Sequence, residues 1–118
     1  MSKKAPSMKK LTEAVTKARE TARLGGGEAR LAKQREAGKM TARERVDALN
    51  DPDSFQEIGL FRKNRTVTFG MDTADMPADG VVTGSATVLG RPVHIASQDF
   101  TVMGGSAGET HSIKVVEM

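Results

Sequence analysis

One stretch near the end of the chain, residues 97–111, constrains the fold more than any other. It combines an extended strand, the glycine pair 104–105 and the first turn of a helix. Ser106 and Glu109 have the three-residue spacing of a capping box. The glycines lack a Cβ, which allows the backbone to turn sharply. The sequence therefore predicts a strand–turn–helix unit whose helix covers residues 107–118 and has Ser106 as its N-cap.

This unit suggests a site that binds through the backbone. A helix N-terminus that follows two glycines presents unbonded N–H groups and the positive end of the helix dipole. Such a terminus suits a phosphate, a carboxylate or a developing oxyanion. A plain strand-to-helix turn without a ligand has the same pattern, so the short motif alone leaves both interpretations open.

The first half of the chain is basic. Its 50 residues contain 13 Lys or Arg against 6 Asp or Glu, whereas residues 51–118 contain 5 against 9. Residues 1–8 have the character of a disordered tail, and residues 9–50 predict a basic helical arm. A basic arm on an acidic body is compatible with nucleic acid, an anionic ligand or an acidic partner.

Three helices are expected within the arm. The first covers residues 9–24 and ends at three glycines, the second covers about 28–37, and the third begins at the Thr41–Glu44 capping box. The first helix has a thin, alanine-rich stripe. We expect it to lie on another surface rather than to fill a core.

The second half changes to strand patterns. Residues 55–59 predict a short strand, and residues 81–88 and 92–100 predict a hairpin with a tight turn at Leu89-Gly90-Arg91. Asp99 ends the second strand. A functional carboxylate is one interpretation of this position, but we expect Asp99 to accept hydrogen bonds within the following turn.

Composition excludes several kinds of site. The chain has no cysteine and two histidines, which leaves no thiolate chemistry and disfavours a metal site. Asp72, Asp75 and Asp79 lack the spacing of a calcium loop, so we interpret them as solvated turn residues. No apolar run is long enough to cross a membrane, and a cytoplasmic setting fits best.

The predicted fold class is α+β to α/β, and it is expected to be incomplete. A strand–turn–helix without a second parallel strand is half of a βαβ unit, and it leaves a sheet edge unpaired. With 118 residues, four phenylalanines and no Trp or Tyr, the chain has little material for a core. We therefore expect either a partner or further chain.

Several motifs in order resemble the carboxyltransferase (β) subunits of biotin-dependent acyl-CoA carboxylases, a family that includes propionyl-CoA carboxylase, methylmalonyl-CoA decarboxylase and transcarboxylase. The resemblance covers residues 9–118, the N-terminal part of such subunits, and its joint order is highly specific. The motifs are Gly25-Gly26-Gly27-Glu28 with Arg30, Gly38-Lys39-Met40-Thr41-Ala42-Arg43-Glu44-Arg45, Asp51-Pro52-Asp53-Ser54-Phe55, Phe69-Gly70-Met71, Pro77 and Asp79, Val81-Val82-Thr83-Gly84, Gly90-Arg91, and Ser97 to Val102 with Gly104-Gly105-Ser106.

The resemblance implies a crotonase-like fold and a specific reaction. It implies transfer of a carboxyl group between carboxybiotin and the α-carbon of a short acyl-CoA, through an enolate held by backbone N–H groups. Residues 51–118 would form the first part of the N-terminal carboxyltransferase domain. Biotin would be carried on a partner protein or domain, and the partners would be the rest of the subunit, further copies and the biotin carboxylase or carrier subunit.

The resemblance places the substrate at the glycine turn. The backbone of Gly104, Gly105, Ser106 and Ala107 would border the acyl-CoA, with no catalytic side chain and no metal in this chain. Substitution of Gly104 or Gly105 is expected to do more harm than loss of the Ser106 hydroxyl. The chain alone is expected to be inactive, since full members continue well beyond this length.

Two other functional classes remain. The chain would be a non-enzymatic assembly module if its helical arm docks a partner on a small β-platform. It would be a basic nucleic-acid binder if the arm contacts phosphates, although no helix-turn-helix or zinc finger is visible. A steep salt dependence of DNA binding would favour the second of these classes.

Overall fold

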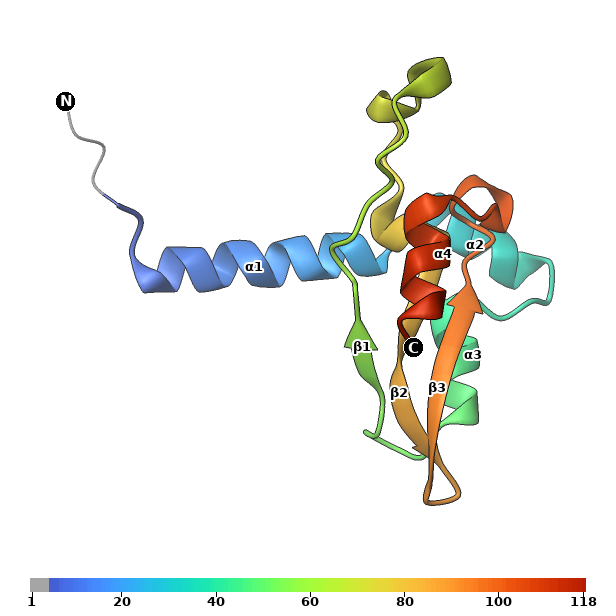
Figure 1. The fold of residues 1–118 in the computed structure, drawn as a ribbon. Helices are drawn as coiled ribbons and strands as arrows, with labels where there is room; N and C mark the ends of the chain where they lie inside the picture. Colours follow the sequence, from blue (N-terminus) through green and yellow to red (C-terminus); the bar gives the residue numbers. More distant parts are fainter. Residues whose placement is uncertain (1–4) are drawn as a thin grey trace.

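The computed structural model describes residues 5–118 as a small sheet flanked by helices, with one helix extending outward (Figure 1). The strands β1 (Gln56–Ile58), β2 (Val81–Val88) and β3 (Arg91–Gln98) form an antiparallel sheet in the order β1-β2-β3. In the view of Figure 1, α3 (Ala42–Leu49) lies behind β2 and β3, and α4 (Glu109–Val116) lies in front of β2. The mixed helix-and-sheet class expected from the sequence is thus observed.

The arm forms the three predicted helices. Helix α1 (Met8–Arg23) is followed by α2 (Glu28–Glu36) and α3. Part of the tail expected over residues 1–8 lies outside the described residues, while the Ser7 side chain accepts the Lys10 amide at the start of α1. The predicted capping box is confirmed, because the Thr41 hydroxyl and the Glu44 carboxylate each accept the other residue's backbone amide.

The predicted hairpin is also confirmed. Strands β2 and β3 pair from Val81–Gln98 to Val88–Arg91, and Leu89 and Gly90 form the turn with φ of 51° and 75°. The carboxylate of Asp51, the residue that follows the arm, accepts the backbone amides of both turn residues at 2.8 Å.

The apolar core is small and sits between α3 and the sheet. Ala42 and Val46 of α3 pack on Val82 of β2, and the partly buried Phe55 and Ile95 complete the cluster. Small side chains in the sheet allow the helix to approach closely. This core fixes the arm on the sheet and leaves the opposite face of the sheet to α4.

The glycine turn after α1 is a second attachment point. A Cβ added to Gly26 would lie 1.9 Å from the carbonyl oxygen of Thr101, so only glycine allows this approach. The Gly26 amide donates to the Thr101 hydroxyl at 3.0 Å. Asp99 accepts the Thr101 amide and hydroxyl at 3.0 and 2.6 Å, which confirms its predicted role in the turn.

The start of α4 corrects the sequence prediction. The helix begins at Glu109 with Gly108 as its N-cap, not at residue 107 with Ser106 as the cap. Ser106 is extended, with ψ of 142°, and its predicted capping box with Glu109 does not form. Ser106 and Gly108 stay extended and delay the start of the helix. The acceptor that caps α4 comes instead from a distant part of the chain.

We predict that Gly26→Ala lowers the free energy of unfolding by about 3 kcal/mol or more, because its Cβ overlaps a backbone carbonyl that cannot rotate away. Gly38→Ala is the matched control. Gly38 has φ of 71° and open space where a Cβ would lie, so its cost is limited to backbone strain of about 1–2 kcal/mol. Urea denaturation of both variants measures the difference, and equal losses would contradict the close approach.

Candidate functional site

The glycine turn has the sharp geometry that the sequence predicts. Met103, Gly104 and Gly105 all have positive φ, at 47°, 65° and 73°. The Gly105 amide donates to the Val102 carbonyl at 2.9 Å, and the Ser106 amide donates to the Met103 carbonyl at 3.2 Å. These two amides therefore stabilise the turn itself. Within the described part of the chain, the Ala107 amide donates to no backbone acceptor.

The turn forms one wall of a cavity of about 210 Å³. The opposite wall is the 61–76 excursion, the irregular segment between the short strand β1 and the turn that precedes β2 (Figure 1). Methionine side chains dominate the apolar part of the lining, and a carboxylate, an amide and hydroxyls supply its polar part. The lining residues are Asn64, Thr66, Met71, Met76, Asp79, Val102, Met103, Ser106, Ala107 and Gly108.

Two ion pairs hold the excursion beside α4. Arg65 contacts Glu109 at 2.8 Å, and Arg62 contacts Glu117 at 2.5 Å, one pair near each end of the helix. All four side chains are largely exposed, so each pair contributes little stability. The excursion wall is thus held by weak contacts, whereas the glycine wall is held by backbone hydrogen bonds.

Asp79 is the acceptor that caps α4. Its carboxylate accepts the His111 amide at 2.7 Å, and the His111 Nδ1 donates to its carbonyl oxygen at 3.0 Å. Asp79 is 4% exposed, so its interpretation as a solvated turn residue is wrong. The reason is that the Pro77–Gly80 turn folds back against α4 and supplies the negative charge that the helix N-terminus attracts.

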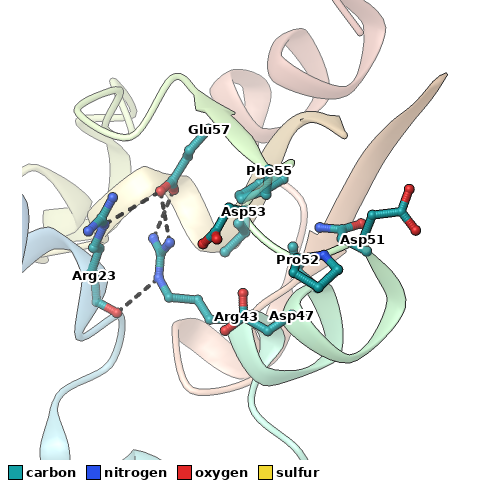
Figure 2. A pocket seen from close by; sticks show the side chains of 11 residues that line it. Arg23, Arg43, Asp47, Asp51, Pro52, Asp53, Phe55 and Glu57 are labelled. Atoms are coloured by element: carbon teal, nitrogen blue, oxygen red, sulfur yellow. Dashed lines mark hydrogen bonds and ion pairs between the residues drawn. The ribbon is translucent and has the colours of Figure 1, made fainter. Parts of the chain in front are cut away.

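An ion-pair cluster joins the arm to the sheet. The Glu57 carboxylate of β1 accepts two hydrogen bonds from Arg43 of α3, both at 2.8 Å, and lies 3.8 Å from Nε of Arg23 at the end of α1. Figure 2 shows this cluster at the rim of a cavity of about 510 Å³, whose acidic side chains include Asp47 and Asp53.

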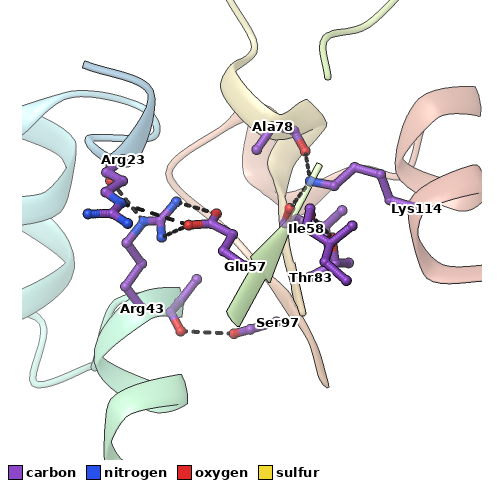
Figure 3. Close-up of polar contacts among 10 residues, drawn as sticks. Arg23, Arg43, Glu57, Ile58, Ala78, Thr83, Ser97 and Lys114 are labelled. Carbon is purple, nitrogen blue, oxygen red and sulfur yellow. Dashed lines mark hydrogen bonds and ion pairs between the residues drawn. The ribbon is translucent and has the colours of Figure 1, made fainter. Parts of the chain in front are cut away.

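Lys114 is the second buried polar residue that joins α4 to the sheet. Its Nζ donates to the Ala78 carbonyl at 2.7 Å and to the Val81 carbonyl (Figure 3). Burial lowers the pKa of Lys114 to about 8, although the negative charges of Glu57 and Asp79 act in the opposite direction. Ala78 and Asp79 both adopt positive φ, at 54° and 48°, so Lys114 and His111 hold a strained turn in place.

Sequence reasoning found one wall of the cavity and missed what supports it. The predicted residues Gly104 to Ala107 lie together at the turn, and Ser106 and Ala107 line the cavity. Asp79, His111 and Lys114 were not predicted. His111 and Lys114 are polar residues on a helix that also carries Ile113 and Val116, which is a weak signal because polar residues on a short helix normally face water. Asp79 lies in the Pro77–Gly80 turn, where an aspartate is an ordinary turn residue.

Two kinds of feature are absent from residues 5–118. No group of His, Cys, Asp or Glu within this range is arranged to hold a metal ion. None of the described helices is both long and apolar enough to cross a membrane.

A protein-family model described as the carboxyl transferase domain matches residues 33–118. The chain belongs to the carboxyl transferase domain family. This confirms the family that the motif order indicates. The match covers the sheet, the glycine turn and α4, and begins within α2, so it includes both walls of the cavity.

Curated relatives support the same assignment over nearly the whole chain. The methylmalonyl-CoA carboxyltransferase 12S subunit of Propionibacterium freudenreichii subsp. shermanii is 62% identical over 98% of this chain and 22% of its own length. The mitochondrial propionyl-CoA carboxylase beta chain of Homo sapiens is 44% identical over 92% of this chain and 20% of its own length. The chain therefore spans about a fifth of the length of these relatives.

Solved structures show the same fold in a larger protein. A crystal structure of transcarboxylase 12S, described as a hexamer assembly with methylmalonyl-coenzyme A and methylmalonic acid bound, superposes with a TM-score of 0.93 at 61% identity. It covers 97% of this chain, and the match takes up 22% of that structure's chain. A single-chain, multi-domain long-chain acyl-CoA carboxylase superposes with a TM-score of 0.78 at 31% identity.

We predict that Lys114→Met removes a pH dependence of stability. The folded pKa of about 8 lies below the 10.5 of an ordinary lysine, so between these values the unfolded chain binds the proton and the folded chain does not. The free energy of unfolding of the native chain therefore rises relative to that of the variant as pH increases from about 8 towards 10.5.

Urea denaturation across this pH range measures the difference. Lys63→Met is the matched control, because Lys63 is exposed and paired with Asp75 at 2.9 Å. Its stability curve should run parallel to that of the native chain. If the stability curve of Lys114→Met also runs parallel to that of the native chain, the lowered pKa of the buried Lys114 amine is contradicted.

Proposed function

We propose that this chain forms the N-terminal part of a biotin-dependent acyl-CoA carboxyltransferase with a crotonase-like fold. The reaction would transfer a carboxyl group between carboxybiotin and the α-carbon of a short acyl-CoA, in the cytoplasm. The observation that carries this proposal is the superposition of 97% of the chain on a transcarboxylase 12S structure that contains methylmalonyl-coenzyme A. Propionyl-CoA and methylmalonyl-CoA are the substrate candidates, because they appear in the names of the relatives.

The cavity at the glycine turn would bind part of the acyl-CoA. Its methionine-rich lining suits the apolar portions of a thioester and its pantetheine arm, and its unbonded Ala107 amide can donate to a carbonyl oxygen. Gly104 and Gly105 shape the backbone, and the amides of Gly105 and Ser106 stabilise that shape. This refines the expected roles: we assign direct donation to Ala107 and positioning to the two glycines.

The α4 terminus restricts what this cavity accepts. The buried Asp79 carboxylate already occupies the positive end of the helix and lines the cavity, which disfavours a phosphate there. The CoA phosphates would therefore lie elsewhere. The carboxyl group itself would be carried by biotin on a partner protein or domain, and we assign no residue of this chain to hold it.

The partners would be the remaining part of a carboxyltransferase subunit, further copies of that subunit and a biotin-carrying subunit. Support comes from the relatives: the chain matches about a fifth of their length, and one of them is described as a hexamer with a multienzyme core. We therefore expect catalysis from the assembled enzyme and none from the 118-residue chain alone.

A hybrid enzyme tests this proposal. The matching segment of the Propionibacterium 12S subunit is replaced by this chain, and carboxyl transfer from methylmalonyl-CoA to biotin is measured. We expect the hybrid to be active, because the two segments are 62% identical. A hybrid that assembles but does not transfer the carboxyl group would contradict the proposal.

Within the hybrid we predict that Gly105→Ala reduces kcat/KM about tenfold or more, while Ser106→Ala stays within about twofold of the parent. An alanine at φ of 73° strains the turn by about 1–2 kcal/mol, which displaces the Ala107 amide. Loss of the exposed Ser106 hydroxyl leaves the backbone unchanged. The reverse order of effects would show that the side chain, not the backbone, contacts the substrate.

A further inference from the structure

The cavity at the glycine turn contains a cluster of methionines that the proposed function uses only as apolar lining. Three of the chain's seven methionines, Met71, Met76 and Met103, line this single space of about 210 Å³. Thioethers are the groups of this lining that a mild oxidant modifies most readily, and the chain has no cysteine to compete for the oxidant. Oxidation of one of these methionines would therefore change the character of the cavity itself.

The three methionines differ in solvent exposure. Met103 is 49% exposed in the turn that joins β3 to α4 (Figure 1), whereas Met76 is 6% exposed and Met71 is partly buried. A peroxide must reach the sulfur atom before it can react with it. Met103 is therefore the methionine of this cavity that an oxidant in solution meets first.

The turn also places a hydrogen-bond donor near Met103. The backbone of Met103 is fixed at φ of 47°, and its carbonyl oxygen accepts the Ser106 amide at 3.2 Å. The Ala107 amide, four residues along the same turn, lines the cavity and donates to no backbone acceptor within the described part of the chain. A thioether sulfur is only a weak acceptor, whereas the oxygen of a sulfoxide is a strong one.

From these observations we propose that Met103 is a site of reversible oxidation by a hydroperoxide, and that its sulfoxide takes the Ala107 amide. The sulfur attacks one peroxide oxygen, the O–O bond breaks, an S=O bond forms, and the other oxygen leaves as water or an alcohol. The thioether loses two electrons and the peroxide gains them. A dithiol acting through a methionine sulfoxide reductase reverses the step, releasing the oxygen as water and forming a disulfide.

The consequence for acyl-CoA rests on the proposed function, which assigns the Ala107 amide to a carbonyl oxygen of the substrate. Oxidised Met103 competes for that amide and makes the apolar lining polar. The modification itself depends only on the cavity and on the exposure of Met103. The two parts of the proposal can therefore be tested separately.

The first test treats the 118-residue chain, with isotope-labelled methionine methyl groups, with hydrogen peroxide. Peptide mass spectrometry and NMR follow the reaction. The Met103 sulfoxide should form before those of Met71 and Met76, and the methyl signals of Met71 and Met76 and the Ala107 amide signal should shift as it forms. The proposal is overturned if Met76 oxidises as fast as Met103, or if these signals do not respond to oxidation of Met103.

Met40 is the matched control for this test. It is 54% exposed, between α2 and α3, and it does not line the cavity. A chain with Met40→Leu should show the same signal shifts on treatment as the native chain. A chain with Met103→Leu should still oxidise at Met40 without those shifts, and shifts that persist there would contradict the role of Met103.

The second test measures carboxyl transfer by the hybrid enzyme before and after peroxide. Oxidation should lower kcat/KM about tenfold, as expected from the loss of one hydrogen bond to the substrate, and methionine sulfoxide reductase with dithiothreitol should restore it. The Met103→Leu hybrid should keep its own kcat/KM after the same treatment. The Met40→Leu hybrid should lose as much as the parent hybrid does.

The outcomes separate this inference from the proposed function. A hybrid that is inactive before any peroxide is added counts against the proposed function, and the first test still decides whether Met103 is the oxidation site. An active hybrid whose Met103→Leu variant loses kcat/KM to peroxide as the parent does would overturn the control of the cavity by Met103.

Discussion

The contact between α4 and the strained turn before β2 determines the rest of the site. Asp79 caps the helix, His111 donates back to the turn, and Lys114 donates to the carbonyls of Ala78 and Val81. Each of these groups would be costly to bury alone, and together they satisfy one another's hydrogen bonds. The helix therefore buries polar residues against the sheet and leaves Ile113 and Val116 exposed. The glycine turn, which connects β3 to this helix, is held between the two fixed elements.

The arm depends on a different principle, the close approach of backbone segments. Gly26 lies against the Thr101 carbonyl, and the small core of Ala42, Val46 and Val82 fixes α3 on the sheet. Because both contacts use small residues, the arm and the strand–turn–helix unit touch at two places without a large apolar core. The relatives extend well beyond the matched fifth of their length, so a large core within these residues alone is not required of the family.

The two cavities differ in the ligands that they suit. The cavity at the glycine turn combines thioether walls, backbone amides such as that of Ala107 and one buried carboxylate, a combination that favours an uncharged chain with amide groups. The larger cavity between α3 and β1 is charged, with the Glu57–Arg43 pair at its rim, and suits a basic partner surface. The first supports the acyl-CoA proposal, because its thioether lining suits the apolar portions of a thioester.

The sequence by itself determined the local elements and the family. The Thr41 capping box, the Leu89–Gly90 hairpin turn and the Asp99 turn each follow from residues close in the chain, and the joint order of the motifs identified the carboxyltransferases. Only the tertiary structure decided how α4 begins. Ser106 has the sequence of a cap, but the carboxylate of Asp79, 32 residues before His111, accepts the His111 amide in the first turn of the helix. Local patterns cannot show such competition, because the winning acceptor is brought there by the folding of the whole sheet.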